Sequence, residues 1–130
     1  MKRHLQIVIL FALLFTSCTK SKKTDSIPLI TITSPKENDS LSSTKINIDF
    51  NVTDEVDLSS VTMEITDEEN NELLSKTTPE ISSTTYIYSN FFTINSNTKT
   101  KTLELHVTAI NEFGNTSEKN IKFKILPQSN

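Results

Sequence analysis

Apolar and polar residues alternate along most of the chain beyond residue 26. The clearest case is residues 44–53, where Ile46, Ile48, Phe50 and Val52 fall on one face and polar residues fall on the other. Alternation with a period of two is typical of a half-buried β-strand and unsuited to a helix. The same pattern, interrupted by polar and Asn-rich breaks, predicts seven strands, over residues 27–33, 44–53, 60–66, 72–76, 84–94, 102–110 and 117–126.

The composition favours the same fold class. The chain has 14 Ile, 5 Val and 19 Thr but only 2 Ala, and β-branched residues fit strands better than helices. Residues 27–126 are enough for one domain and too few for two. Short strands at this spacing predict an all-β domain, a β-sandwich of about seven antiparallel strands.

Two features of the loops need particular conformations. The single glycine, Gly114, lies in the segment 111–115 between the last two strands, where we expect a positive φ. We expect Asn to supply other left-handed turn positions, because it tolerates that conformation. Phe91 and Phe92 cannot both point inward on a regular strand, so either a bulge or an outer apolar patch must accommodate them.

The first 18 residues have the layout of a secretory signal. Lys2 and Arg3 precede an apolar run over residues 7–15, which is shorter than the roughly 20 residues that span a bilayer. The segment Phe15-Thr16-Ser17-Cys18 resembles the lipobox of bacterial lipoproteins, in which the cysteine is lipidated and begins the mature chain. The alternative is an ordinary signal peptide with an incidental cysteine.

The lipobox resemblance, with Phe in place of the commoner Leu, implies a lipoprotein of the Bacteroidetes type. It divides the chain into a signal peptide (1–17), a lipidated Cys18 with a polar linker (18–26), the folded domain (27–126) and a tail (127–130). Thr19 stands where an Asp would imply inner-membrane retention, so the resemblance implies a lipid anchor in the outer membrane. Lysines rather than acidic residues follow Thr19, which favours a domain facing the periplasm over one exposed on the cell surface.

Three segments of the domain resemble bacterial immunoglobulin-like domains. Residues 30–35 end in Ser-Pro, residues 48–54 contain Val-Thr-Asp, and residues 107–115 contain Ala-Ile-Asn-Glu-Phe-Gly-Asn. The resemblance implies an immunoglobulin-like β-sandwich and does not identify a ligand. Asn111 occupies the place where that family often has Asp, which weakens any inherited metal role of this loop.

Charge and residue types exclude several functions. Residues 27–126 carry 8 Lys and 15 acidic residues, a net charge of −7 that disfavours binding to nucleic acid. Beyond residue 18 the chain has one His (His106), no Arg and no Cys, so catalytic triads, thiol nucleophiles and Arg-assisted phosphoryl transfer lack their parts. We therefore expect no enzyme. The alternative is a small hydrolase that uses Asp54 with Asp57 or Glu112 as a carboxylate pair.

The loops around residues 54–57 and 111–115 fall at one end of an immunoglobulin-like sandwich. Their oxygen donors, Asp54, Glu55, Asp57 and Glu112, are candidate Ca²⁺ ligands. The simpler interpretation is that these acids keep exposed turns soluble, and no cofactor is then required.

The aromatic residues Tyr86, Tyr88, Phe91 and Phe92 are the candidate binding surface. Exposed on a sheet, they would stack on sugar rings or anchor a protein. The alternative is that they fill the core of a chain that has no Trp. The sequence thus predicts a non-catalytic, lipid-anchored envelope module that binds a glycan or protein partner or serves as a complex subunit.

Overall fold

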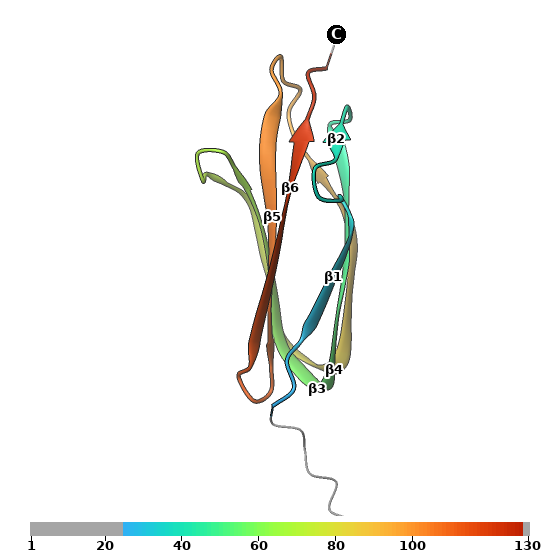
Figure 1. The fold of residues 1–130 in the computed structure, drawn as a ribbon, viewed down its shortest axis with the longest axis vertical. Helices are drawn as coiled ribbons and strands as arrows, with labels where there is room; N and C mark the ends of the chain where they lie inside the picture. The colour runs from blue at the N-terminus through green and yellow to red at the C-terminus, as the bar shows by residue number, and fades with distance from the viewer. Residues whose placement is uncertain (1–24, 129–130) are drawn as a thin grey trace, which may run out of the picture.

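The computed structural model describes residues 25–128, and all of their regular secondary structure is β-strand. Figure 1 shows six strands. The predicted all-β fold is confirmed. The strands are β1 (Leu29–Ser34), β2 (Ser40–Leu41), β3 (Lys45–Asp67), β4 (Glu72–Thr93), β5 (Lys101–Asn111) and β6 (Thr116–Ile125).

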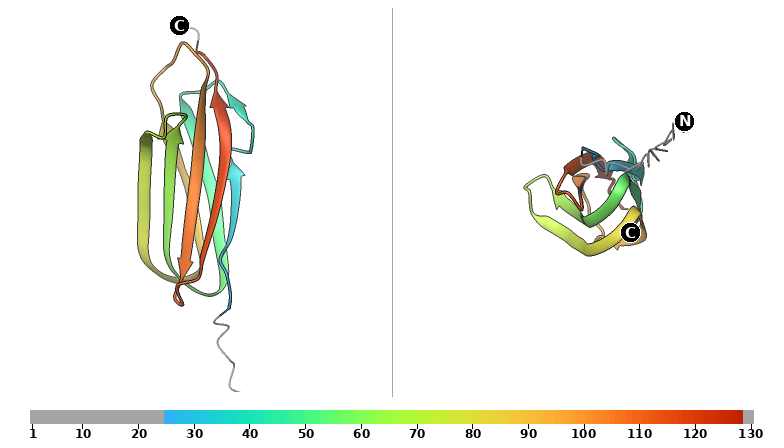
Figure 2. Two further views of the ribbon diagram at one scale, coloured as in Figure 1. Left: turned by 60° about the vertical axis from the view of Figure 1, so that its left-hand side comes forward. Right: turned by 90° about the horizontal axis from the view of Figure 1, so that it is seen from below.

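The six strands form one hydrogen-bonded sheet that curls on itself. Its order is β1-β3-β5-β6-β2, and β4 pairs with β3. All pairings are antiparallel except that of β2 with β6, which is parallel. Seen from its end in Figure 2, the sheet curls around a central space, and the apolar core lies there.

The prediction of seven separate strands is wrong at β3 and β4. β3 is one continuous strand where two were expected, at 44–53 and 60–66, and β4 is one strand where two were expected, at 72–76 and 84–94. The register of β3 with β4 shifts between Thr53 and Leu58, where both strands bend, and the two strands are paired on either side of the bend. Glu80 and Ser82 carry the bend in β4, with φ values of 53° and 47°. The first half of β3 pairs with β1 and its second half with β5.

The buried side chains come from the predicted inward positions. Val52, Ile65, Leu105 and Phe123 are all 0% exposed, and they belong to one cluster drawn from both halves of the curled sheet. Phe92 is buried at 9% exposure. Its neighbour Phe91 is 55% exposed. Of the two adjacent phenylalanines, one therefore points into the core and the other points outward.

The turns use the expected residues. Asn38 and Asn70 adopt φ values of 65° and 61°, and Gly114 has φ 82°. The strand β2 was not predicted, because two residues are too short to show alternation. Pro79, expected in a loop, lies within β4; it is tolerated there because β4 has a neighbour on one side only.

The chain enters and leaves the sheet at opposite ends (Figure 1). The described chain begins at the end that holds the bends of β3 and β4 and the β5–β6 hairpin, and it ends at the end near β2. No helix within residues 25–128 has the length and hydropathy that a membrane span needs. The predicted signal peptide and Cys18 lie outside the described residues.

We predict that core and surface phenylalanines differ sharply in their effect on stability. Phe123→Ala removes a ring with 0% exposure and is expected to lower the free energy of unfolding by about 3–5 kcal/mol. Phe113→Ala, at 39% exposure, is the matched control and should cost much less. Chemical denaturation measures both, and equal losses would contradict this core.

Candidate functional site at the N-terminal end of the sheet

Three segments far apart in the sequence meet where the chain enters the sheet. The side-chain amide of Asn111 donates to the Ser26 carbonyl oxygen at 2.9 Å and to Asp54 Oδ2 at 3.0 Å. Asn115 donates from its own amide to the same Ser26 oxygen at 2.8 Å, and the Ser26 hydroxyl donates to Asp54 Oδ1. We call these four residues the Asn111 cluster.

Asn111 is the centre of the cluster and is itself 1% exposed. Its Oδ1 accepts the backbone N–H groups of Phe113 and Asn115, each at 3.0 Å. Both donors and the acceptor of the amide are therefore used, as a buried polar side chain requires. The amide joins the β5–β6 hairpin, the β3 bend and the incoming chain.

Asp54 is held in its ionised form. Partial burial raises the pKa of its carboxyl, but hydrogen bonds from Ser26, from Asn111 and from the backbone amides of Glu55 and Val56 together outweigh burial. The net pKa lies below the ordinary value. Asp54 therefore acts as a charged hydrogen-bond acceptor.

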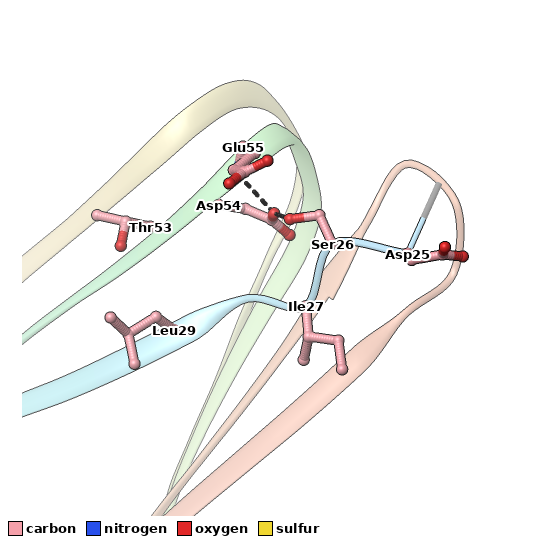
Figure 3. A pocket seen from close by; sticks show the side chains of 7 residues that line it. All are labelled: Asp25, Ser26, Ile27, Leu29, Thr53, Asp54 and Glu55. Atoms are coloured by element: carbon pink, nitrogen blue, oxygen red, sulfur yellow. Dashed lines mark hydrogen bonds between the residues drawn. The ribbon is translucent and has the colours of Figure 1, made fainter. Parts of the chain in front are cut away.

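An open hollow of about 640 Å³ lies beside the cluster. Figure 3 shows Ser26 meeting Asp54, with Ile27 and Leu29 along the incoming chain. Ile27 and Leu29 are 64% and 65% exposed. The hollow thus has an apolar side on the incoming chain and an acidic side at Asp54 and Glu55.

The four calcium candidates lie on the two segments that meet here. The backbone N–H of Glu112 donates to the carbonyl oxygen of Asp57 at 2.8 Å, which ties the hairpin to the bend. Both carboxylate oxygens of Asp54 accept hydrogen bonds from protein groups. Within residues 25–128, no three side chains of His, Cys, Asp or Glu are grouped closely enough to hold a metal ion. The structure thus offers no preformed calcium site among the described residues.

The aromatic candidates divide between the two faces of β4. Tyr86 and Tyr88 are half-buried against Phe50, with ring centroids 6.2 and 5.2 Å away. The Tyr86 hydroxyl lies 2.9 Å from Thr78 Oγ1. Phe92 is buried, and Phe91 points outward beneath Lys45 Nζ, 3.7 Å from its ring centroid. The structure therefore does not bring the four aromatic residues together on one exposed surface.

The outward-facing side chains of β5 and β6 include polar and charged residues that contact one another. His106 on β5 lies 3.6 Å from Glu118 on β6. The pKa of Glu104 is lowered, first by the hydrogen bond that Asn120 donates to it and further by the nearby Lys122. These contacts are cross-strand pairs on an exposed surface.

Sequence analysis missed Ser26 as a partner in this cluster. Ser26 precedes the alternating pattern of β1, so nothing in its local sequence signals a long-range contact. The available signal is Asn111 itself, since an amide can donate to Asp54 and an ionised carboxylate cannot.

No family model and no curated protein sequence matches this chain. Several solved structures are similar to it. An engineered protein is similar with a TM-score of 0.54 and 18% identity over 75% of this chain, which spans 20% of that protein. CopC from Methylosinus trichosporium OB3b has a TM-score of 0.48 and 13% identity, covering 81% of this chain and 97% of CopC. The E. coli chaperone DraB has a TM-score of 0.47 and 9% identity, covering 78% and 56%.

The chain is a small β domain. The engineered protein supports that statement about the fold alone, because its identity to this chain is low.

We predict that Asn111→Asp destabilises the domain. It replaces the amide that lies 3.0 Å from Asp54 Oδ2 with a second carboxylate, and we expect a loss of about 2–3 kcal/mol in unfolding free energy at pH 7. Millimolar calcium should restore part of that loss by neutralising the pair and should leave the wild-type melting temperature unchanged. Asn95→Asp, at an exposed position between β4 and β5, is the control. An Asn111→Asp chain as stable as this control would contradict the structural role of the amide.

Acid unfolding tests the charge on Asp54. Its lowered pKa means that it contributes stability above the ordinary value of 3.8, and that this contribution is lost as pH falls through the folded-state pKa. Asp54→Asn should therefore cost about 1–3 kcal/mol at pH 7 and progressively less below about pH 4. Denaturant unfolding from pH 7 to pH 2 measures the difference. Asp57→Asn is the control, and parallel loss of stability in wild type and Asp54→Asn would refute the assignment.

Proposed function

We propose that this protein is a non-catalytic, lipid-anchored immunoglobulin-like module of the bacterial outer membrane that serves as a binding module or complex subunit. The observation that carries the proposal is the Asn111 cluster. Ser26, the last residue of the predicted linker, is bound to the end of the domain by hydrogen bonds from Asn111 and Asn115. A linker bound in this way would join the domain at a fixed point beside the β5–β6 hairpin.

The strand order supports an immunoglobulin-like topology. β1 pairs antiparallel with β3, whereas β2 pairs parallel with β6, so the N-terminal segment contacts both halves of the curled sheet. The bends of β3 and β4 support a sandwich, because β1 pairs with the first half of β3 and β5 pairs with its second half. The Ser-Pro and Asn-Glu-Phe-Gly-Asn motifs occupy the end of β1 and the β5–β6 hairpin.

The state of Asp54 argues against the alternative of a carboxylate hydrolase. In a carboxylate pair one group is a general acid, which needs a raised pKa, and the other is an ionised base or nucleophile, which needs an available oxygen. The pKa of Asp54 is lowered, and its oxygens accept hydrogen bonds from Ser26 and Asn111. These contacts suit a structural carboxylate.

The lipid anchor has a direct test. Two or three acyl chains hold a protein firmly in a membrane, so the wild-type chain should fractionate with membranes and incorporate a palmitate analogue. Cys18→Ser is expected to lose the label and leave the membrane fraction, while Lys20→Ser, a change in the linker, should retain both. An unlabelled wild-type chain, or a Cys18→Ser chain still in the membrane, would overturn the anchor.

A further inference from the structure

The second half of β4 is an open edge of the sheet. β4 pairs with β3 alone and has no neighbour on its other side within the described chain. An open edge presents unpaired backbone groups, and proteins commonly protect it with charges or proline.

The two halves of β4 differ in this protection. The first half carries Glu72, Lys76, Pro79 and Glu80. From Ile81 to Ile94 the chain has no charged residue and no proline. The second half of β4 itself therefore carries neither a charge nor a proline that would oppose the addition of another strand.

In the second half of β4, the backbone N–H and C=O groups of the odd-numbered residues point away from β3. The N–H of Phe91 donates to Asn90 Oδ1 at 2.8 Å, and the N–H of Thr85 donates to Ser83 Oγ at 3.2 Å. Antiparallel pairing directs both backbone groups of alternate residues to the same side. Ile87 and Ser89, between these two residues, thus face the open edge as well.

Two of the side chains at these positions are exposed and apolar. Ile87 is 73% exposed and Phe91 is 55% exposed. They lie two residues on either side of Ser89 on the outer face of the strand. This spacing is self-complementary, because an antiparallel copy centred on Ser89 places each Ile87 opposite the Phe91 of its neighbour.

We propose that a second copy of this chain pairs with the second half of β4, antiparallel and centred on Ser89. In this arrangement odd-numbered residues face one another as hydrogen-bonded pairs, and the Phe91 N–H exchanges Asn90 Oδ1 for a backbone carbonyl of the other chain. The two Ile87–Phe91 contacts are related by a two-fold axis, as in most homodimers. No charged residues of β4 oppose one another along the paired segment, because the second half of the strand carries none.

The pairing adds a partner to the proposed module and does not depend on the lipid. Because the strands run in opposite directions, the two Asp25 residues lie at opposite ends of the pair. Lipid on both chains would then orient the strands along the membrane plane.

A cysteine introduced at the centre of the pair tests this register. In membranes carrying the full chain, mild oxidation of Ser89→Cys should give severalfold more disulfide-linked dimer than Ser75→Cys. Ser75 is an exposed residue in the protected half of the same strand. The wild-type chain, whose only cysteine is Cys18, supplies the background. Equal yields from Ser89→Cys and Ser75→Cys, in chains with the same β-sheet circular dichroism, would overturn the proposal.

A charge exchange tests the specific contact. In the Ser89→Cys chain, Ile87→Lys should abolish the additional dimer, because a charged side chain displaces an apolar contact. Adding Phe91→Glu should restore it, because opposite charges then face one another across the axis. Failure to restore it in a folded chain would exclude this register.

The same oxidation in a Cys18→Ser chain separates the two proposals. A dimer that depends on Ser89→Cys and forms without the anchor, together with a failed lipid label, would refute the anchor alone. A labelled chain that gives no such dimer would refute the pairing alone.

Discussion

The pairing of β3 with β4 through their common bend is the constraint on which the rest of the fold depends. Both strands change direction near Thr53 to Leu58 of β3, and they remain paired on either side of the bend. One two-stranded ribbon thereby runs through both halves of the curled sheet. β1 extends the sheet beside the first half of β3, and β5, β6 and β2 extend it beside the second half. The buried side chains of the two halves then face each other across a single core.

The bend also creates the Asn111 cluster. It places Asp54 at the end of the sheet, where the β5–β6 hairpin and the incoming chain arrive. A carboxylate in that position needs donors, and Ser26 and Asn111 supply them. A neutral amide at position 111 lets three segments meet by hydrogen bonds alone. A second carboxylate there would repel Asp54 unless a proton or a cation neutralised the pair.

The alternating pattern predicts the strands and their inward faces, because in a strand with one buried face every second residue must be apolar. Val52, Leu105 and Phe123 are buried where the pattern places them. Continuity through the bends could not be predicted, because the apolar positions change phase between Leu58 and Val61 and residues 77–83 show no alternation. The pairing of these segments depends on the neighbouring strand.

The candidate site was predictable only in part. The meeting of the 54–57 and 111–115 loops follows from topology. The contribution of Ser26 does not, since a contact spanning 85 residues leaves no local signal. The outward position of Phe91 follows from its adjacency to Phe92, whereas the inward packing of Tyr86 and Tyr88 depends on the position of Phe50.

The placement of the two chain ends determines how the domain bears mechanical load. The described chain begins and ends at opposite ends of the strands, so tension between the proposed lipid anchor and a partner bound near β2 would run parallel to the strands. β1 is paired along its length with β3. Such tension would shear all of these backbone bonds together, whereas tension across the strands would open them one after another. The contacts of Ser26 with Asn111 and Asn115 precede β1, so the tether would transmit load to the hairpin before it reached the strand.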